Sequence, residues 1–316
     1  MARGHVTLDR PRSGDVHTIA NVLRALEYAA PGAAPSRRDA AETIAGAGPQ
    51  DHAIRLNGDF AGMVGTSGER FVIWTDPVVQ GRGLATRAAV IALTRAFVAG
   101  AARIVASHDP GDHRAGVMLA RLGFRRAREA GDTTDQGPVA LTLTGADFAA
   151  RHPVTVTTQR LVIDELRPSD RETFHRIVTQ PDVARMLLRF RPDMTLKAIE
   201  PMFPTESLIP PYRLTARLDG RVIGSVGLGA GAAPEIYYFI HPSVAGGGLA
   251  SEMVAGFCSE IIDRYGFAAL SAEVFQDNPA SRHILEKNGF AVVSEHNLKS
   301  HGRSAPAPAW VMRRGE

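Results

Sequence analysis

An internal repeat constrains this 316-residue chain more than any other feature of its sequence. Four segments of the first half recur in the second half, in the same order and about 160 residues later. This period is too long for a solenoid and indicates a duplicated domain. We expect one copy over residues 1–150 and the other over 151–316, joined near 145–158. The paired segments are VTLDRPRSGD and LVIDELRPSD, IRLNGDFAGMVG and ARLDGRVIGSVG, FVIWTDPVVQGRGLATR and IYYFIHPSVAGGGLASE, and LARLGF and LEKNGF.

Each copy contains signals for both strands and helices. Asn57-Gly58 and Asp219-Gly220 are dipeptides typical of tight β-hairpins. Apolar residues recur at helical spacing over 249–265, and the stretch 84–98 is apolar almost all round. The predicted order is strand, one or two helices, hairpin, strand, Gly-rich turn, helix, strand, short helix ending at Gly-Phe, and closing strands. The fold class is therefore α/β with a mixed sheet, and both long helices should pack on a sheet.

Composition excludes several classes of protein. The hydrophobic fraction of 44% suffices for two cores, and no stretch reaches the roughly 20 apolar residues of a membrane span. The first residues lack an apolar signal segment, so we expect a cytoplasmic protein without a membrane partner. The net charge of +3 is scattered, which argues against a nucleic-acid partner. The single cysteine, Cys258, excludes an internal disulfide and a cysteine metal site, and we expect it to be buried.

A Gly-rich turn precedes the long helix of each copy, and such a turn can bind an anion. The first N–H groups of a helix lack partners, and glycines let a phosphate approach them. A plain tight connection between strand and helix is the alternative. A P-loop is excluded because no lysine lies near either turn, and a Rossmann motif is excluded because GLGAG at Gly227 leads into a strand.

The pattern QxxGxA, formed by Gln80, Gly83 and Ala85, resembles the acetyl-CoA pyrophosphate loop of the GNAT acyltransferase superfamily. EIYYFIHPSVAGGGLASEMV followed by DNPASRHILEKNGF resembles the ribosomal-protein N-terminal acetyltransferase branch of that superfamily. With the repeat, the resemblance covers nearly the whole chain. It implies two tandem GNAT-like acyl-CoA N-acyltransferase domains that use acetyl-CoA as co-substrate, act on an amine acceptor and need no metal.

The resemblance also assigns cofactor-binding residues. In the second copy the family loop's basic or polar residue is replaced by Ala245 and Gly247, so phosphate binding should rest on backbone amides alone. In the first copy Arg82 adds a possible charge-assisted contact. The assigned residues are Gly246, Gly247, Gly248, Ala250 and Ser251 in the second copy, and Gln80, Gly81, Arg82, Gly83 and Ala85 in the first.

Asn278 and Ser281 are matched to family positions near the pantetheine arm. Asn278 before Pro279 also reads as a helix N-cap followed by the first helical residue, and the two roles are compatible. The first copy has Asp112 and Ala115 at these places. Each copy thus keeps a different half of the family's cofactor site.

Acetyl transfer to an amine requires a base, a polarised carbonyl and a stabilised leaving thiolate. The resemblance places the polarising backbone N–H near Phe239 and Ile240, and it matches Glu235 to the family's base. Glu235 could instead be an exposed or ion-paired carboxylate at the start of a strand, and Glu273 is a second candidate base. No tyrosine acid is expected, because Leu285 and Leu119 occupy its place.

The first copy lacks a matched base. Arg70 aligns with Glu235 and cannot act as a base at neutral pH, although Glu69 beside it is a possible substitute. We therefore expect catalysis in the C-terminal domain. His241 and Asp76, each before a proline, should shape turns rather than act in catalysis.

The function predicted is acetyl transfer to a primary amine, either a protein N-terminus or a small molecule. A non-catalytic acyl-CoA-binding pair and an enzyme using another acyl donor are the alternatives. The acceptor-side segments of the two copies share little sequence. In the second copy the arginines of this segment either attract a carboxylate-bearing acceptor or form a solvated helix face; they are Arg185, Arg189 and Arg191.

Overall fold

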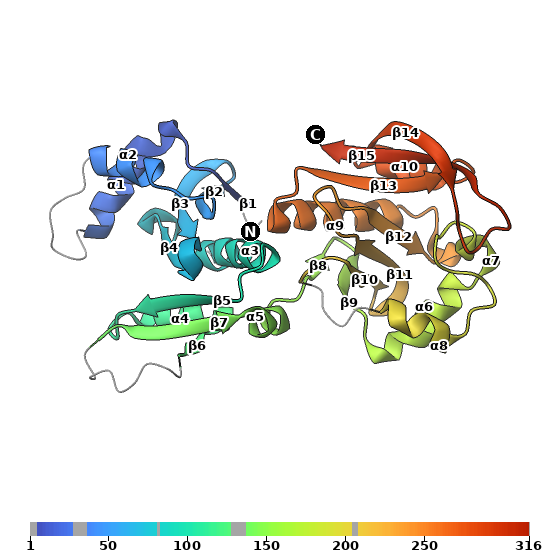
Figure 1. The fold of residues 1–316 in the computed structure, drawn as a ribbon, viewed down its shortest axis with the longest axis horizontal. Coiled ribbons are helices and arrows are strands. Elements are labelled where there is room, and N and C mark those ends of the chain that lie inside the picture. The colour runs from blue at the N-terminus through green and yellow to red at the C-terminus, as the bar shows by residue number, and fades with distance from the viewer. Residues whose placement is uncertain (1–4, 28–36, 81–82, 128–136, 204–207, 316) are drawn as a thin grey trace. The chain divides into compact units, whose positions relative to one another are not determined.

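The computed structural model describes residues 5–27, 37–80, 83–127, 137–203 and 208–315. Two compact units make up the chain. The N-terminal unit is Met1–His152 with Asp263–Gly266, and the C-terminal unit is Pro153–Ile262 with Phe267–Glu316. Both units combine helices and β-sheets, so the α/β prediction is confirmed (Figure 1).

The C-terminal unit is built on two sheets. The first has the strand order β12-β11-β10-β9-β8, and the second has the order β13-β15-β14; all of the pairs within these sheets are antiparallel. The strands are β8 (Val156–Thr157), β9 (Leu161–Glu165), β10 (Tyr212–Leu218), β11 (Arg221–Leu228), β12 (Ile236–Ile240), β13 (Ala269–Phe275), β14 (Ala291–Leu298) and β15 (Ala307–Gly315). The helices are α6 (Arg171–Val178), α7 (Pro181–Ala184), α8 (Leu196–Ile199), α9 (Leu249–Tyr265) and α10 (Pro279–Lys287).

The N-terminal unit has the corresponding strand order. One sheet runs β1-β2-β3-β4 and the other β5-β7-β6. Its strands are β1 (Val6–Asp9), β2 (Asp51–Leu56), β3 (Asp59–Gly65), β4 (Val72–Thr75), β5 (Arg103–His108), β6 (Arg125–Arg126) and β7 (Val139–Thr144). Its helices are α1 (Val16–Glu27), α2 (Arg37–Ala45), α3 (Leu84–Val98), α4 (His113–Leu122) and α5 (Gly145–Arg151).

The long helix of each unit forms where the apolar pattern predicts it. α9 buries Met253, Val254, Phe257, Cys258 and Ile261 completely, so one apolar face of this helix lies in the core. Cys258 is a free, buried thiol, as predicted. α3 spans the predicted residues 84–98, and most of its side chains are buried.

Both predicted hairpins are present. Asn57 and Gly58 connect β2 to β3 with φ angles of 54° and 95°, and Asp219 and Gly220 connect β10 to β11 with φ angles of 49° and 77°. Positive φ at both central residues is what a two-residue turn of this hand requires, and Asn, Asp and Gly tolerate it best. The hairpins set the register of the strands that carry the site.

A buried charge network precedes each hairpin turn in the sequence, and neither network was predicted from the sequence. In the C-terminal unit Arg217 Nε lies 2.7 Å from Asp164 Oδ1, and Arg217 Nη1 lies 2.9 Å from Asp170 Oδ1. In the N-terminal unit Arg55 makes the same contacts with Asp9 and Asp15, at 2.9 and 2.7 Å. Burial of an ion pair is tolerated because its hydrogen bonds are satisfied.

The described part of the chain contains no helix that is long and apolar enough to cross a membrane. The segment 145–158, predicted as the junction of the copies, contains α5 and β8.

Candidate functional site

Strands β12 and β13 start side by side and then separate into different sheets. A single parallel bridge joins Glu235 to Ser271, where Ser271 N donates to Pro234 O at 3.0 Å. Beyond the bridge β12 pairs with β11, and β13 pairs with β15. The facing edges of β12 and β13 are therefore unpaired, within the described residues, toward the ends of both strands.

The backbone of β12 presents N–H groups to this unpaired edge. His241 N donates to Ile223 O, and Glu235 O accepts from Gly229 N. The backbone N–H and C=O groups of the odd-numbered residues of β12 therefore point toward β11. Because backbone groups alternate along a strand, the N–H groups of Tyr238 and Ile240 point away from β11. Ile240, the predicted polarising position, thus has its N–H directed toward the edge that faces β13.

The triple-glycine loop joins β12 to α9. Gly246 and Gly248 have φ angles of 83° and 77°, which only glycine adopts without strain, and a Cβ at Gly246 would meet nothing within 4 Å. The first hydrogen bond of this helix runs from Glu252 N to Gly248 O at 3.0 Å. Within the described residues the preceding amides, including those of Ala250 and Ser251, have no intrahelical acceptor and can therefore bind an anion.

An arginine from a distant segment lies on this loop. Arg160 Nη1 donates to Gly247 O at 2.9 Å, and Arg160 Nη2 lies 3.5 Å from the Cβ that a residue at 248 would carry. The loop was predicted to bind phosphate through its backbone amides alone, and this stays a prediction. A guanidinium stands beside them, supplied by the turn before β9 rather than by the loop itself.

Glu252 in the first turn of α9 holds Arg160 in place. Its carboxylate accepts from Arg160 Nε at 2.6 Å, from Arg160 N at 2.7 Å and from the Thr158 hydroxyl at 2.6 Å. Hydrogen bonds from Thr158 and Arg160 lower the pKa of Glu252 against the effect of burial, so it stays ionised. We call Thr158, Arg160 and Glu252 the loop clamp.

Glu235 lies at the bridge between β12 and β13 and is half-buried. Burial and the nearby Glu273 carboxylate together raise its pKa to about 7, against the opposing effect of Arg189. Glu273 itself pairs with His296, 3.2 Å away. The raised pKa of Glu235 suits proton transfer near neutral pH.

Asn278 caps α10, since its side chain accepts from Ser281 N at 3.1 Å. Its Nδ2 group donates no hydrogen bond among the described residues. The Ser281 hydroxyl lies 2.8 Å from the Tyr238 hydroxyl, which reaches it from β12. Burial raises the pKa of Tyr238 to about 12. Sequence reasoning missed this contact, because alternation along a strand does not show what an outward side chain meets.

The N-terminal unit repeats the backbone arrangement with different side chains. Arg70 forms a parallel bridge to Val105 and so occupies the place that Glu235 has in the C-terminal unit. Glu69 lies 3.8 Å from Arg103. Asp112 caps α4 by accepting from Ala115 N at 3.0 Å. Three predicted loop residues are described: Gln80 ends the short 3₁₀ turn, Gly83 precedes α3 with φ 74°, and Ala85 lies in its first turn. Gly81 and Arg82 lie outside the described residues.

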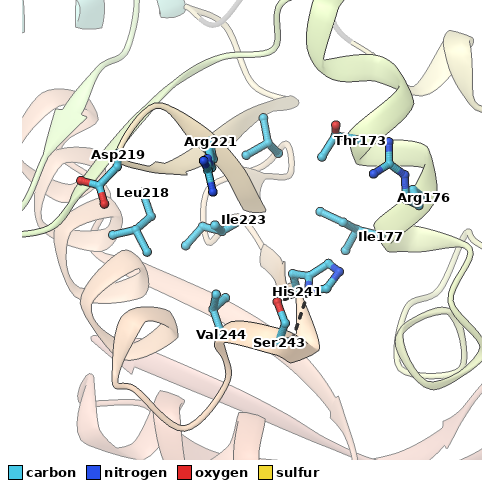
Figure 2. Close-up of a pocket in the computed structure, with 11 residues that line it drawn as sticks. Thr173, Arg176, Ile177, Leu218, Asp219, Arg221, Ile223, His241, Ser243 and Val244 are labelled. Atoms are coloured by element: carbon cyan, nitrogen blue, oxygen red, sulfur yellow. Dashed lines mark hydrogen bonds between the residues drawn. The ribbon is translucent and has the colours of Figure 1, made fainter.

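His241 and Asp76 shape turns, as predicted. His241 Nδ1 accepts from Ser243 N at 3.1 Å, and Asp76 Oδ1 accepts from Val78 N at 2.9 Å. Figure 2 shows His241 and Ser243 at one wall of a cavity of about 600 Å³ between α6 and the β10–β11 hairpin. Glu235 does not line this cavity, so the cavity is not the place of the candidate base.

No group of three or more histidine, cysteine, aspartate or glutamate side chains suited to a metal occurs in the described ranges.

Comparison with known proteins places a family domain over these elements. Residues 160–291 match the sequence profile of the acetyltransferase (GNAT) domain family. No curated protein matches the chain.

Solved structures resemble about half of the chain. RimJ of Mycobacterium smegmatis, in complex with CoA-disulfide, is 19% identical over 52% of this chain and 88% of its own, with a TM-score of 0.43. Spermidine N-acetyltransferase of Vibrio cholerae, in complex with CoA and spermine, is 15% identical over 49% and 94%, with a TM-score of 0.43. Ribosomal-protein-S5-alanine acetyltransferase of Vibrio fischeri is 13% identical over 51% and 96%, with a TM-score of 0.40.

The family assignment rests on the domain match, which covers the strand pair, the glycine loop and α10. The match supports an acyltransferase as the class of this part of the chain. More narrowly, it supports the GNAT superfamily for residues 160–291 of the 316.

Proposed function

We propose that the protein is an acetyl-CoA-dependent N-acetyltransferase that acts on a primary amine and that its C-terminal unit is the catalytic one. The observation that carries the proposal is the arrangement around the unpaired edge of β12. Glu235 stands at the start of this edge, the Ile240 N–H faces it, and the glycine loop with Arg160 follows its end.

The loop would hold the pyrophosphate of acetyl-CoA. The amides of Gly248, Leu249, Ala250 and Ser251 would donate to the phosphate oxygens, and Arg160 Nη2 adds a donor that the loop itself lacks. The unused Nδ2 group of Asn278 is available to the pantetheine arm. When bound, acetyl-CoA supplies the activated acetyl thioester.

The chain's own groups would meet the remaining requirements of acetyl transfer. With a pKa of about 7, half of the Glu235 side chains are ionised near neutral pH, which suits the removal of a proton from an ammonium acceptor. The Ile240 N–H would donate to the thioester oxygen as it gains charge. The paired hydroxyls of Tyr238 and Ser281 would donate a hydrogen bond to the leaving sulfur.

We further propose that the N-terminal unit, about residues 1–150, is a second GNAT-like domain without this activity. The equal strand order, the parallel bridge at Arg70 and the Arg55 network support the common fold. Arg70 in the place of Glu235 supports the lack of a base. The retained glycine turn before α3 leaves cofactor binding as its remaining capacity.

Matched tryptophan substitutions test the assignment of the units. Gly83 and Gly248 have φ angles of 74° and 77°, so Gly83→Trp and Gly248→Trp impose similar backbone strain. Circular dichroism checks folding, calorimetry measures acetyl-CoA binding, and thiol release on a panel of amines measures turnover. Only Gly248→Trp should abolish turnover. Loss of turnover in Gly83→Trp alone contradicts the assignment, binding without turnover of any amine favours a non-catalytic pair, and preference for a longer acyl-CoA favours another donor.

A further inference from the structure

Arg213 of β10 is a half-buried cation that lies among aromatic rings on the acceptor side of the C-terminal unit. Its guanidinium carbon is 4.4 Å from the centre of the Tyr237 ring. The rings of Phe174, Phe190 and Phe239 have their centres 5.7, 5.9 and 6.0 Å away. Among the described residues, its one hydrogen bond runs from Nη1 to the Ser225 hydroxyl at 3.3 Å.

No carboxylate pairs with Arg213 in the part of the chain that the structure describes. Burial lowers its pKa to about 10, and no acidic residue is among the groups that act on it. Arg217, four residues along the same strand, is instead matched by Asp164 and Asp170. Aromatic faces offset only part of the cost of removing a cation from water, so the site of Arg213 lacks a negative charge.

This positive charge lies on the same face of the sheet as the candidate base. Glu235, Tyr237 and Phe239 alternate along β12 and share one face of the strand, so Arg213, stacked on Tyr237, lies on the face of Glu235. Arg189 is exposed, acts electrostatically on Glu235, Tyr237 and Arg213, and makes no ion pair among the described residues.

The neighbouring arginines, unlike Arg189, make ion pairs. Arg185 pairs with Asp277, and Arg191 pairs with Asp193. All three arginines of this segment follow the end of α7 at Ala184, so they do not form a helix face, although Arg189 and Arg191 are exposed to solvent as that alternative expected. Only Arg189 of the three is left to act beside Arg213.

We propose that Arg213, assisted by Arg189, binds a carboxylate of the acyl acceptor, so that the acceptor class is an amine that also carries a carboxylate, such as an amino acid or peptide. The inference rests on the proposed function, because it places the acceptor next to Glu235. The N-terminal unit has Asp51 at the position of Arg213 in the equivalent strand β2, so it would not bind such an acceptor.

Product binding tests the proposal independently of turnover. The probes are N-acetyl derivatives of ω-amino acids from glycine to 6-aminohexanoate, each with its carboxamide, titrated into the full-length protein with CoA present. One chain length should let the acetylated nitrogen lie next to Glu235 while the carboxylate reaches Arg213. At that length the acid should bind at least tenfold more tightly than the carboxamide. Arg213→Met and Arg213→Gln should remove this difference, whereas Arg221→Met, an exposed control on β11, should retain it.

Stability separates ligand binding from a structural role. Arg213→Met places an apolar side chain among the rings of Phe174, Phe190, Tyr237 and Phe239. The melting temperature of this variant should therefore not fall below that of the wild type. Any of three results overturns the proposal. They are equal binding of acid and carboxamide at every length, discrimination that persists in Arg213→Met, and tighter binding of spermidine than of the acids. Failure of acetyl-CoA to bind contradicts the proposed function. In that case titrations without CoA still compare the binding of the acid with that of the carboxamide, so the role of Arg213 is tested separately.

Discussion

Replacement of Glu235 by glutamine should stabilise the C-terminal unit at high pH and leave it unchanged at low pH. The cause is the position of this carboxyl group, which is half-buried and close to the Glu273 carboxylate. Both burial and the like charge disfavour the ionised form. Glutamine has a similar shape and no charge, so the substitution removes the cost of ionisation without removing the side chain.

The size and sign of the effect follow from proton linkage. The pKa of Glu235 is about 7 in the folded protein, against an ordinary value of 4.5. Between these values the folded state holds a proton that the unfolded state has lost, so stability falls as pH rises. The whole difference corresponds to about 3 kcal/mol. Glu235→Gln should therefore match the wild type near pH 4 and exceed its stability by up to about 3 kcal/mol above pH 7.

Urea unfolding at a series of pH values measures this difference, with Glu172→Gln on the exposed face of α6 as the control. Thiol release over the same pH range measures activity, which should rise with the ionisation of Glu235 in the wild type and be lost in the variant. A stability difference between Glu235→Gln and the wild type that does not change with pH would refute the reasoning. Raised stability together with full activity would show that Glu235 is a strained carboxylate and not the base.

The other predictions concern the loop clamp, the buried networks and the thiol. Arg160→Ala should weaken acetyl-CoA binding about tenfold in calorimetry and leave S-acetylpantetheine, which lacks the pyrophosphate, unaffected; equal loss for both would show a general distortion. Arg217→Ala should destabilise the C-terminal unit by about 3–5 kcal/mol in urea, because Asp164 and Asp170 lose their partner, and Arg55→Ala should do the same to the N-terminal unit; losses below 1 kcal/mol would contradict this. Cys258, fully buried and with its pKa raised to about 11, should react with a thiol reagent only on unfolding, and fast reaction of the native protein would contradict its burial.

The elements of the fold were predictable because their signals are local. Apolar spacing predicts α3 and α9, and the dipeptides Asn57-Gly58 and Asp219-Gly220 predict the hairpins. The repeat then extends each element of one unit to the other. The glycine loop and Asn278 were found in the same way, because a turn and a cap depend on residues a few positions apart.

The charged partners of the site were not predictable, because they depend on residues far apart in the sequence. Arg160 reaches Gly247 across 87 positions, and no local pattern indicates that contact. Arg213 looks like an ordinary outward residue of an alternating strand until Tyr237 and the phenylalanines are placed around it. The state of Glu235 likewise depends on Glu273, from the strand that separates from β12.

The two units share the charges that support the fold but differ in the charges at the site. Arg217 with Asp164 and Asp170 has its counterpart in Arg55 with Asp9 and Asp15, contact for contact. At three positions of the site the matched charge has the opposite sign: Arg70 stands for Glu235, Asp51 for Arg213 and Arg87 for Glu252. Because reversal of a buried network costs stability, only charges outside it are free to change. An acceptor and a base that suit one unit would thus be repelled or missing in the other, which argues that the two units do not catalyse the same reaction.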